Sequence, residues 1–298
     1  MPESDVTFYS EGVKVQGTLS IPDGATEGLK CPGVVLVHGY ASFRDELTGF
    51  VELAEKLRAH DMVSLRFDLR GCGRSGEPGR IVPHLEWTAD SLAAVSYLQS
   101  IGQVDSRRIG VVGMSVGGGT ACYVAGIDKR VKCTVALAPV ADGAWWLEHL
   151  WTTRRGAKAW EAFQERLAVD RVERAKTGRS EKVPIGEVLA FRPEDQKRWN
   201  QLLARYPQFT REVYLSSADS LVNFKPLGLV RLVAPRPIRF IHSEDDESVP
   251  IVHGEELYAA AGDVKDLIRI KGSPHCFWMG DQGGHVQDLA VEWLLEHL

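Results

Sequence analysis

The most restrictive feature of the sequence is an alternation of short apolar runs and helical segments between residues 31 and 137. Residues 34–37 form a continuous apolar run, which is typical of a strand buried on both faces. The alternation continues through a helix at 46–59, a strand at 62–67, a helix at 86–100, a strand ending before Ser115, another helix and a strand at 133–137. This order predicts a mostly parallel central sheet with helices on both faces.

The alternation is interrupted once, between residues 141 and 227. This segment contains no convincing buried strand, is richer in charge and tryptophan, and has mostly helical spacing. Before the interruption, residues 6–20 predict an antiparallel hairpin, and after it strand signals resume at 237–243 and 266–270, ahead of a C-terminal helix. We therefore expect residues 1–140 and 228–298 to form one α/β domain and residues 141–227 to form a helical cap inserted into it.

Composition excludes several classes of protein. The net charge of -5 argues against binding to nucleic acid or to an anionic membrane surface. Five cysteines without a CxxC pair predict neither a disulfide framework nor a metal site. No apolar run approaches the ~20 residues that span a bilayer, and the N-terminus has no apolar signal segment. We expect a cytoplasmic protein that needs no cofactor or metal, acts on a small molecule and forms a homodimer.

The segment GMSVG at 113–117 matches the pattern GxSxG at a junction between strand and helix. In a nucleophile elbow, this junction is a tight turn that holds the serine hydroxyl exposed, and the flanking glycines allow strand and helix to approach closely. The N–H groups and dipole of the following helix favour negative charge beside the serine. The motif by itself also fits a glycine-rich helix start with an incidental serine, so partners for Ser115 are needed.

A serine nucleophile needs a base and an acid that orients the base. Acids at 244–247 follow the strand at 237–243, and His275 follows the strand at 266–270. Active sites gather at the carboxyl ends of parallel strands, so both groups are expected at one edge of the sheet. The chain order of serine, acid and histidine is the order found in nucleophile-elbow hydrolases.

Five segments together resemble one family: HGY at 38–40, FDLRGCGRSG at 67–76, GMSVGG at 113–118, APRPIRFIHSEDDESVP at 234–250 and SPHCF at 273–277. The chain resembles serine hydrolases of the α/β-hydrolase superfamily, in the esterase and acyl-peptidase-like branch that includes dienelactone hydrolase and feruloyl esterase relatives. The resemblance implies the α/β-hydrolase fold with Ser115, Asp246 and His275 as a catalytic triad. Asp246 is preferred because the family's aspartate precedes a Val-Pro pair, and Asp245 is the alternative.

The same resemblance suggests roles around the triad. Acyl transfer requires two N–H donors for the oxyanion, which we expect from Val116 and Tyr40. His38 is expected to shape the loop that carries Tyr40. Asp68 and Arg70 are expected to structure their own loop, where Cys72 replaces the family's usual histidine. In the cap, Trp145 and Trp146 are candidates for the substrate pocket, whereas Trp151 and Trp160 fit the core of the cap itself.

The leading functional hypothesis is a serine hydrolase that cleaves a carboxylic ester through an acyl-enzyme. The same triad serves two alternatives: cleavage of an amide or short peptide, and cleavage of a C–C bond in a diketone. A third alternative is a non-catalytic ligand receptor on the same scaffold, because a fold does not by itself imply a function.

Overall fold

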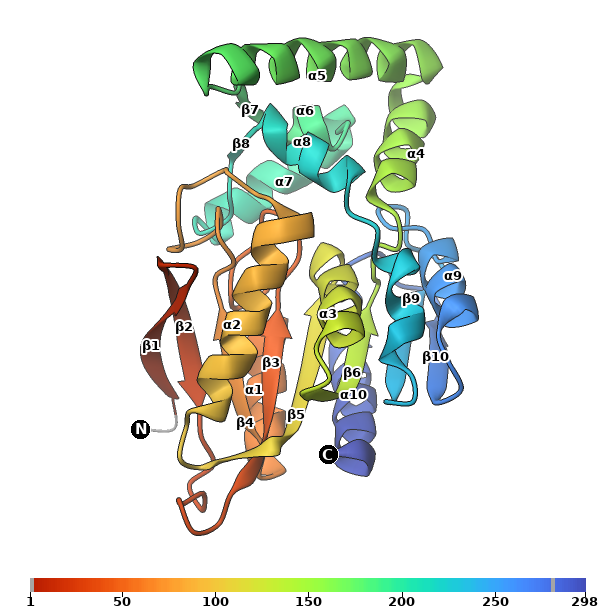
Figure 1. The fold of residues 1–298 in the computed structure, drawn as a ribbon. Coiled ribbons are helices and arrows are strands. Elements are labelled where there is room, and N and C mark those ends of the chain that lie inside the picture. Colours follow the sequence, from red (N-terminus) through yellow and green to blue (C-terminus); the bar gives the residue numbers. More distant parts are fainter. Residues whose placement is uncertain (1–2, 280–281) are drawn as a thin grey trace.

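The computed structural model describes residues 3–279 and 282–298 and contains an eight-stranded sheet in the order β1-β2-β4-β3-β5-β6-β9-β10 (Figure 1). The strands are β1 (Glu3–Ser10), β2 (Val13–Ser20), β3 (Cys31–Val37), β4 (Val63–Phe67), β5 (Val104–Met114), β6 (Val131–Leu137), β9 (Ile238–Ser243) and β10 (Lys265–Ile270). From β4 to β10 the neighbouring strands are parallel, and only β2 runs antiparallel to its neighbours, β1 and β4. The predicted mostly parallel sheet is confirmed, and the predicted hairpin is its antiparallel edge.

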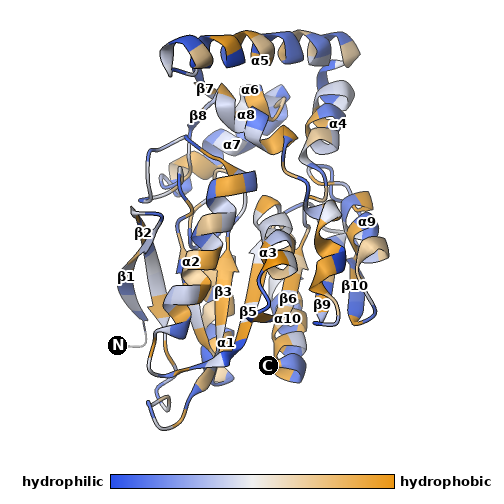
Figure 2. Ribbon diagram, in the orientation of Figure 1, coloured by the Kyte–Doolittle hydropathy of each residue, from blue (hydrophilic) through white to orange (hydrophobic). Residues whose placement is uncertain are grey.

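Helices cover both faces of this sheet, as predicted. On one face lie α2 (Thr88–Gln99) and α3 (Val116–Ile127), and on the other lie α1 (Gly49–Ala59) and α10 (Gly283–His297) (Figure 1). Successive side chains of β3 join opposite cores, Val35 and Val37 on the first face and Val34 and Leu36 on the second. Figure 2 shows the resulting apolar centre of the sheet. Within residues 3–279 and 282–298, no helix has the length and apolar character that a bilayer crossing demands.

The start of one helix and the presence of another differ from the expectation. The helix expected at 86–100 is preceded by a π-helical turn, η1 (Pro83–Trp87), so that α2 itself begins at Thr88. A further helix, α9 (Val252–Ala260), packs beside β9 and β10.

Between β6 and β9 the chain forms a group of helices that lies across the end toward which the parallel strands point (Figure 1). Its elements are α4 (Gly143–Arg155), α5 (Ala157–Thr177), α6 (Ile185–Val188), α7 (Pro193–Arg205) and α8 (Leu215–Val222), followed by the 3-10 turns η2 (Pro226–Gly228) and η3 (Val230–Val233). The group also contains a small antiparallel sheet of β7 (Lys182–Pro184) and β8 (Glu212–Tyr214). The sequence did not predict this sheet, because three-residue strands are too short to show an alternating pattern.

Candidate active site

Ser115 occupies the turn between β5 and α3 with a positive φ of 57°. This strained conformation is rare for a residue with a side chain, and the Ser115 N–H donates to the Leu137 carbonyl at 2.8 Å. A Cβ on Gly113 would lie 2.1 Å from the Gly117 carbonyl oxygen, and a Cβ on Gly117 would lie 2.2 Å from that of His38. The glycines of the motif therefore permit the close approach of β3, β5 and α3 that the turn needs.

Asp246 and His275 lie on the loops that follow β9 and β10. The Asp246 Oδ2 atom is 2.6 Å from His275 Nδ1, and Asp246 Oδ1 accepts the N–H groups of Ser248 and Val249, each at 2.8 Å. Burial acts to raise the pKa of Asp246, but the charge on His275 and these hydrogen bonds outweigh it and hold the pKa below its ordinary value. The ionised carboxylate therefore faces the Nδ1 proton of His275.

The neighbouring acid and histidine point elsewhere. Asp245, the alternative acid, accepts the Gly272 N–H at 2.7 Å. His242 Nε2 lies 3.8 Å from Asp246 Oδ2 and donates to the Val249 carbonyl at 2.8 Å. Burial lowers the pKa of His242, so its ring is neutral. Of these groups, only His275 is hydrogen-bonded to Asp246 and also partly open to solvent.

Ser115 and Glu46 both border the space beside Gly39. The position that a Gly39 Cβ would occupy lies 3.5 Å from both Ser115 Cβ and Glu46 Oε2, and the charge on His275 reaches Glu46. No hydrogen bond joins Ser115 Oγ to the His275 ring in the described part of the chain. Such contacts are often long in a ligand-free site and shorten when substrate binds.

Two backbone N–H groups next to Ser115 are available to a ligand. Neither Tyr40 nor Val116 donates its N–H to another residue among those that the structure describes. Val116 is the first residue of α3, where the N–H has no partner within the helix. The Gly39 N–H is not available, because it donates to Glu46 Oε2 at 2.5 Å. The Tyr40 ring is buried beside Trp87, which leaves only its backbone for the role expected of it.

His38 holds the loop after β3 in place. Its Nε2 accepts the Leu69 N–H at 3.0 Å, and its Nδ1 donates to the Gly39 carbonyl at 2.8 Å. Burial lowers the pKa of His38 to about 4, so the ring stays neutral near pH 7. This geometry fits the loop-shaping role expected from the sequence.

Residues 71–76, GCGRSG, have the GxGxxG spacing of a dinucleotide-binding loop. We did not consider this match when we expected that the protein needs no cofactor. The loop does not open a helix, since the next helical turn begins only at Pro83. A Cβ on Gly73 would lie 2.3 Å from Asp68 Cγ, so the Asp68 carboxylate fills the concave side of the loop. That carboxylate also accepts the N–H groups of Arg44 and Arg74. A negatively charged side chain in this place would repel the pyrophosphate of a dinucleotide.

The same loop region carries Arg70, which pairs with buried Asp90 at 2.6 Å through its Nε. This ion pair fits the structural role expected of Arg70. Within residues 3–279 and 282–298, no group of three His, Cys, Asp or Glu side chains is arranged to hold a metal ion.

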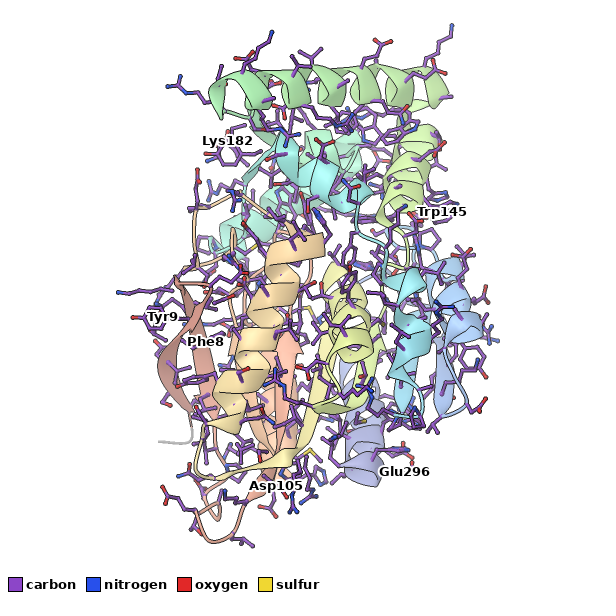
Figure 3. All side chains as sticks on the ribbon, in the orientation of Figure 1. Phe8, Tyr9, Asp105, Trp145, Lys182 and Glu296 are labelled. Atoms are coloured by element: carbon purple, nitrogen blue, oxygen red, sulfur yellow. The ribbon has the colours of Figure 1, made fainter. Side chains whose placement is uncertain are left out.

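The two tryptophans expected at the substrate pocket occupy different environments. Trp146 is buried, and its Nε1 donates to the Ser248 carbonyl at 2.6 Å, which ties α4 to the loop of Asp246. Trp145 lies on α4 (Figure 3) and is 41% exposed. Its ring is stacked on His149 and edge-on to His253. The structure therefore places Trp146 against the acid loop and Trp145 toward solvent. Trp151 and Trp160 pack with each other inside the cap.

A cavity of about 860 Å³ lies at the junction of the cap and residues 77–84, away from Ser115, Asp246 and His275. Several arginines line it, but acids neutralise most of them. Asp219 pairs with both Arg171 and Arg174. None of Ser115, Asp246 and His275 lines the cavity, so the cavity is separate from these three residues.

The sequence analysis missed Glu46. This residue lies in the loop after β3 at a positive φ of 43°, is 5% exposed, and has no ion-pair partner among the described residues. Burial raises the pKa of Glu46 to about 7, even though the Gly39 N–H and the charge on His275 act to lower it. Its only sequence signal is its place a few residues after HGY.

Comparisons with known proteins show to which family the chain belongs. A 31.7 kDa Escherichia coli protein from the traX-finO intergenic region is 27% identical over 292 residues, covering 97% of each chain. The α/β hydrolase GrgF from Penicillium has a similar structure, with a TM-score of 0.82, 21% identity and coverage of 100% and 99% of the two chains. Est1E from Butyrivibrio proteoclasticus, solved with ferulic acid, superposes with a TM-score of 0.71 at 18% identity, covering 98% of each chain. Residues 34–285 match the model of the alpha/beta hydrolase family, and the chain belongs to that family.

Proposed function

We propose that the protein is a serine hydrolase that cleaves a carboxylic ester through a Ser115–His275–Asp246 triad. The observation that carries the proposal is the 2.6 Å contact between Asp246 and His275, on strand-end loops at the same edge of the sheet as the strained turn of Ser115. Hydrolases of this architecture use that order of groups.

In the proposed mechanism, His275 Nε2 accepts the proton of Ser115 Oγ as this oxygen attacks the substrate carbonyl. The N–H groups of Tyr40 and Val116 bind the oxyanion, and Asp246 stabilises the imidazolium that forms. His275 then donates the proton to the departing alkoxide, which leaves an acyl-enzyme. Water, deprotonated by His275, releases the acid by the same steps.

An ester is the preferred substrate class because the sequence motifs around the candidate triad resemble those of esterases. The similar structure of Est1E was solved with ferulic acid, a carboxylic acid that an esterase reaction would release. Amides and diketones pass through similar tetrahedral intermediates, so substrate tests must separate them.

The experiment compares the wild-type protein with Ser115→Ala on aryl esters, aminoacyl anilides and vinylogous diketones. We expect aryl esters to be turned over fastest and the variant to lose about 10⁴- to 10⁶-fold in turnover. A fluorophosphonate probe should label Ser115 in the wild type only. Esterase activity of Ser115→Ala close to the wild-type value would refute the mechanism, and an unlabelled wild type would favour a receptor.

A further inference from the structure

Glu46 brings a second carboxyl group to the site from a different loop than Asp246. Its Oε2 accepts the Gly39 N–H at 2.5 Å, in the loop that also carries Tyr40. The position that a Cβ on Gly39 would occupy lies 3.5 Å from Glu46 Oε2, 3.6 Å from Glu46 Oε1 and 3.5 Å from Ser115 Cβ. The carboxyl of Glu46 and the serine therefore face each other across a glycine that has no side chain to separate them.

Among the residues that the structure describes, none provides Glu46 with the cation that normally accompanies a buried carboxylate. The titratable groups near it are His275 and Cys276 on the loop after β10 and Cys72 on the loop after β4. Burial and neighbouring acids raise the pKa of the Cys72 thiol, so it is neutral near pH 7. The pKa of the Cys276 thiol is raised as well, although this residue is exposed. Among these neighbours, His275 is the one whose charge acts to lower the pKa of Glu46.

We propose that Glu46 is a positioning residue of the site, which fixes the Gly39 peptide of the oxyanion loop and, when ionised, favours the protonated form of His275. This inference rests on the proposed function, because it assigns a role relative to the same base and oxyanion donors.

The first part of the role follows from geometry. With its N–H bound to Glu46, the peptide before Gly39 has one orientation, and the next N–H along the chain, that of Tyr40, is the one left without a partner. A donor contributes to catalysis only when it is aimed in advance at the developing oxyanion. Removing the acceptor at position 46 should therefore misalign this loop.

The second part of the role follows because the charges of Glu46 and His275 act on each other with equal free energy. The charge on His275 lowers the pKa of Glu46, so the ionised Glu46 must stabilise the protonated His275 by the same free energy. Protonated His275 cannot act as the base. Glu46 therefore shifts the loss of activity on acidification toward higher pH, and two coupled protons govern that loss.

The test measures the rate of fluorophosphonate labelling from pH 5 to pH 9 for the wild type, Glu46→Gln, Glu46→Ala and Glu55→Gln. In this reaction the Ser115 oxygen bonds to phosphorus, fluoride leaves, and His275 takes the serine proton. Glutamine keeps an oxygen for the Gly39 N–H and removes only the charge, whereas alanine removes both. Glu55, exposed on α1, provides a matched control for the loss of one carboxylate.

We expect the pH midpoint of labelling to fall by about half to one pH unit in Glu46→Gln and to stay unchanged in Glu55→Gln. At the high-pH plateau, Glu46→Ala should label at least about tenfold more slowly than Glu46→Gln. A Glu46→Gln midpoint equal to that of the wild type would overturn the proposal while leaving the triad intact. A wild type that does not label would refute the serine mechanism and the role of Glu46 with it.

A measurement on the wild type alone covers the case in which the variants do not fold. The NMR signal of the proton on His275 Nδ1 should shift in two steps between pH 5 and pH 9 if Glu46 titrates beside it. A single-step shift would contradict the coupling.

Discussion

Asp246 and His275 are 29 residues apart in the chain, yet Asp246 Oδ2 and His275 Nδ1 lie 2.6 Å apart. They meet because β9 and β10 are neighbouring parallel strands whose carboxyl ends lie at one edge of the sheet. Three further contacts, from Ser248, Val249 and Trp146, fix the loop that carries Asp246. The position of the acid is therefore set by the sheet and by the cap together.

Asp246→Asn should lower turnover by about 10⁴-fold, because an amide no longer stabilises the imidazolium or holds the His275 tautomer with its proton on Nδ1. The matched control is Asp245→Asn, whose side-chain oxygen still accepts the Gly272 N–H. We expect this control to retain turnover close to the wild-type value. Steady-state kinetics on one aryl ester checks both, and equal losses in the two variants would contradict the assignment.

Because Glu46 is buried, we expect the free energy of unfolding to depend on pH in an unusual direction. Because folding raises its pKa from 4.5 to about 7, the contribution of its neutral form is fully present below pH 4.5 and is lost as the pH rises through 7. Glu46→Gln should therefore gain about 3 kcal/mol in unfolding free energy relative to the wild type between pH 4.5 and pH 8. Urea denaturation at both pH values measures this. A difference that stays constant with pH, as expected for Glu55→Gln, would rule out a buried neutral carboxyl.

Substitutions at Trp146 distinguish the packing of its ring from its hydrogen bond to Ser248. The sequence made Trp146 a candidate for the substrate pocket, but the ring is buried, so Trp146→Ala should cost about 3–5 kcal/mol of stability. Trp146→Phe retains most of the packing and loses the hydrogen bond to Ser248, at a cost of about 1 kcal/mol. Its turnover should fall more than its melting temperature, because the Asp246 loop loosens.

The control for this series is Trp145→Phe, since that ring is partly exposed and packs on His149 and His253 instead of the Asp246 loop. Melting temperature and ester turnover close to wild-type values are expected for it. If Trp145→Phe and Trp146→Phe lose turnover equally, the hydrogen bond to Ser248 is not what positions the acid loop.

Gly117→Ala should disrupt the turn of Ser115. The new Cβ would lie 2.2 Å from the His38 carbonyl oxygen and 2.3 Å from that of Val37, which are backbone atoms that cannot rotate away. We expect a loss of at least about 1–3 kcal/mol in stability and little fluorophosphonate labelling. Gly228→Ala, where no atom lies within 4 Å of the new Cβ, should melt and label like the wild type.

The sequence by itself determined the sheet, its two helical layers and the order of the candidate triad. These features depend on local spacing and on chain order, since apolar runs and helical periodicity report burial on one face or two. The turn of Ser115 is also a local feature, because Gly113 and Gly117 each lie two residues from it and their small size is visible in the sequence.

Only the tertiary structure decided which side chains face one another. It separated Asp246 from Asp245, placed Asp68 inside the GxGxxG loop, turned Trp145 outward and Trp146 toward the acid loop, and buried Glu46 beside Gly39. Neighbouring residues in a loop have nearly the same sequence signal, whereas their directions depend on backbone angles and on strands from distant parts of the chain. Contacts of this kind are set by packing between elements, which no local pattern encodes.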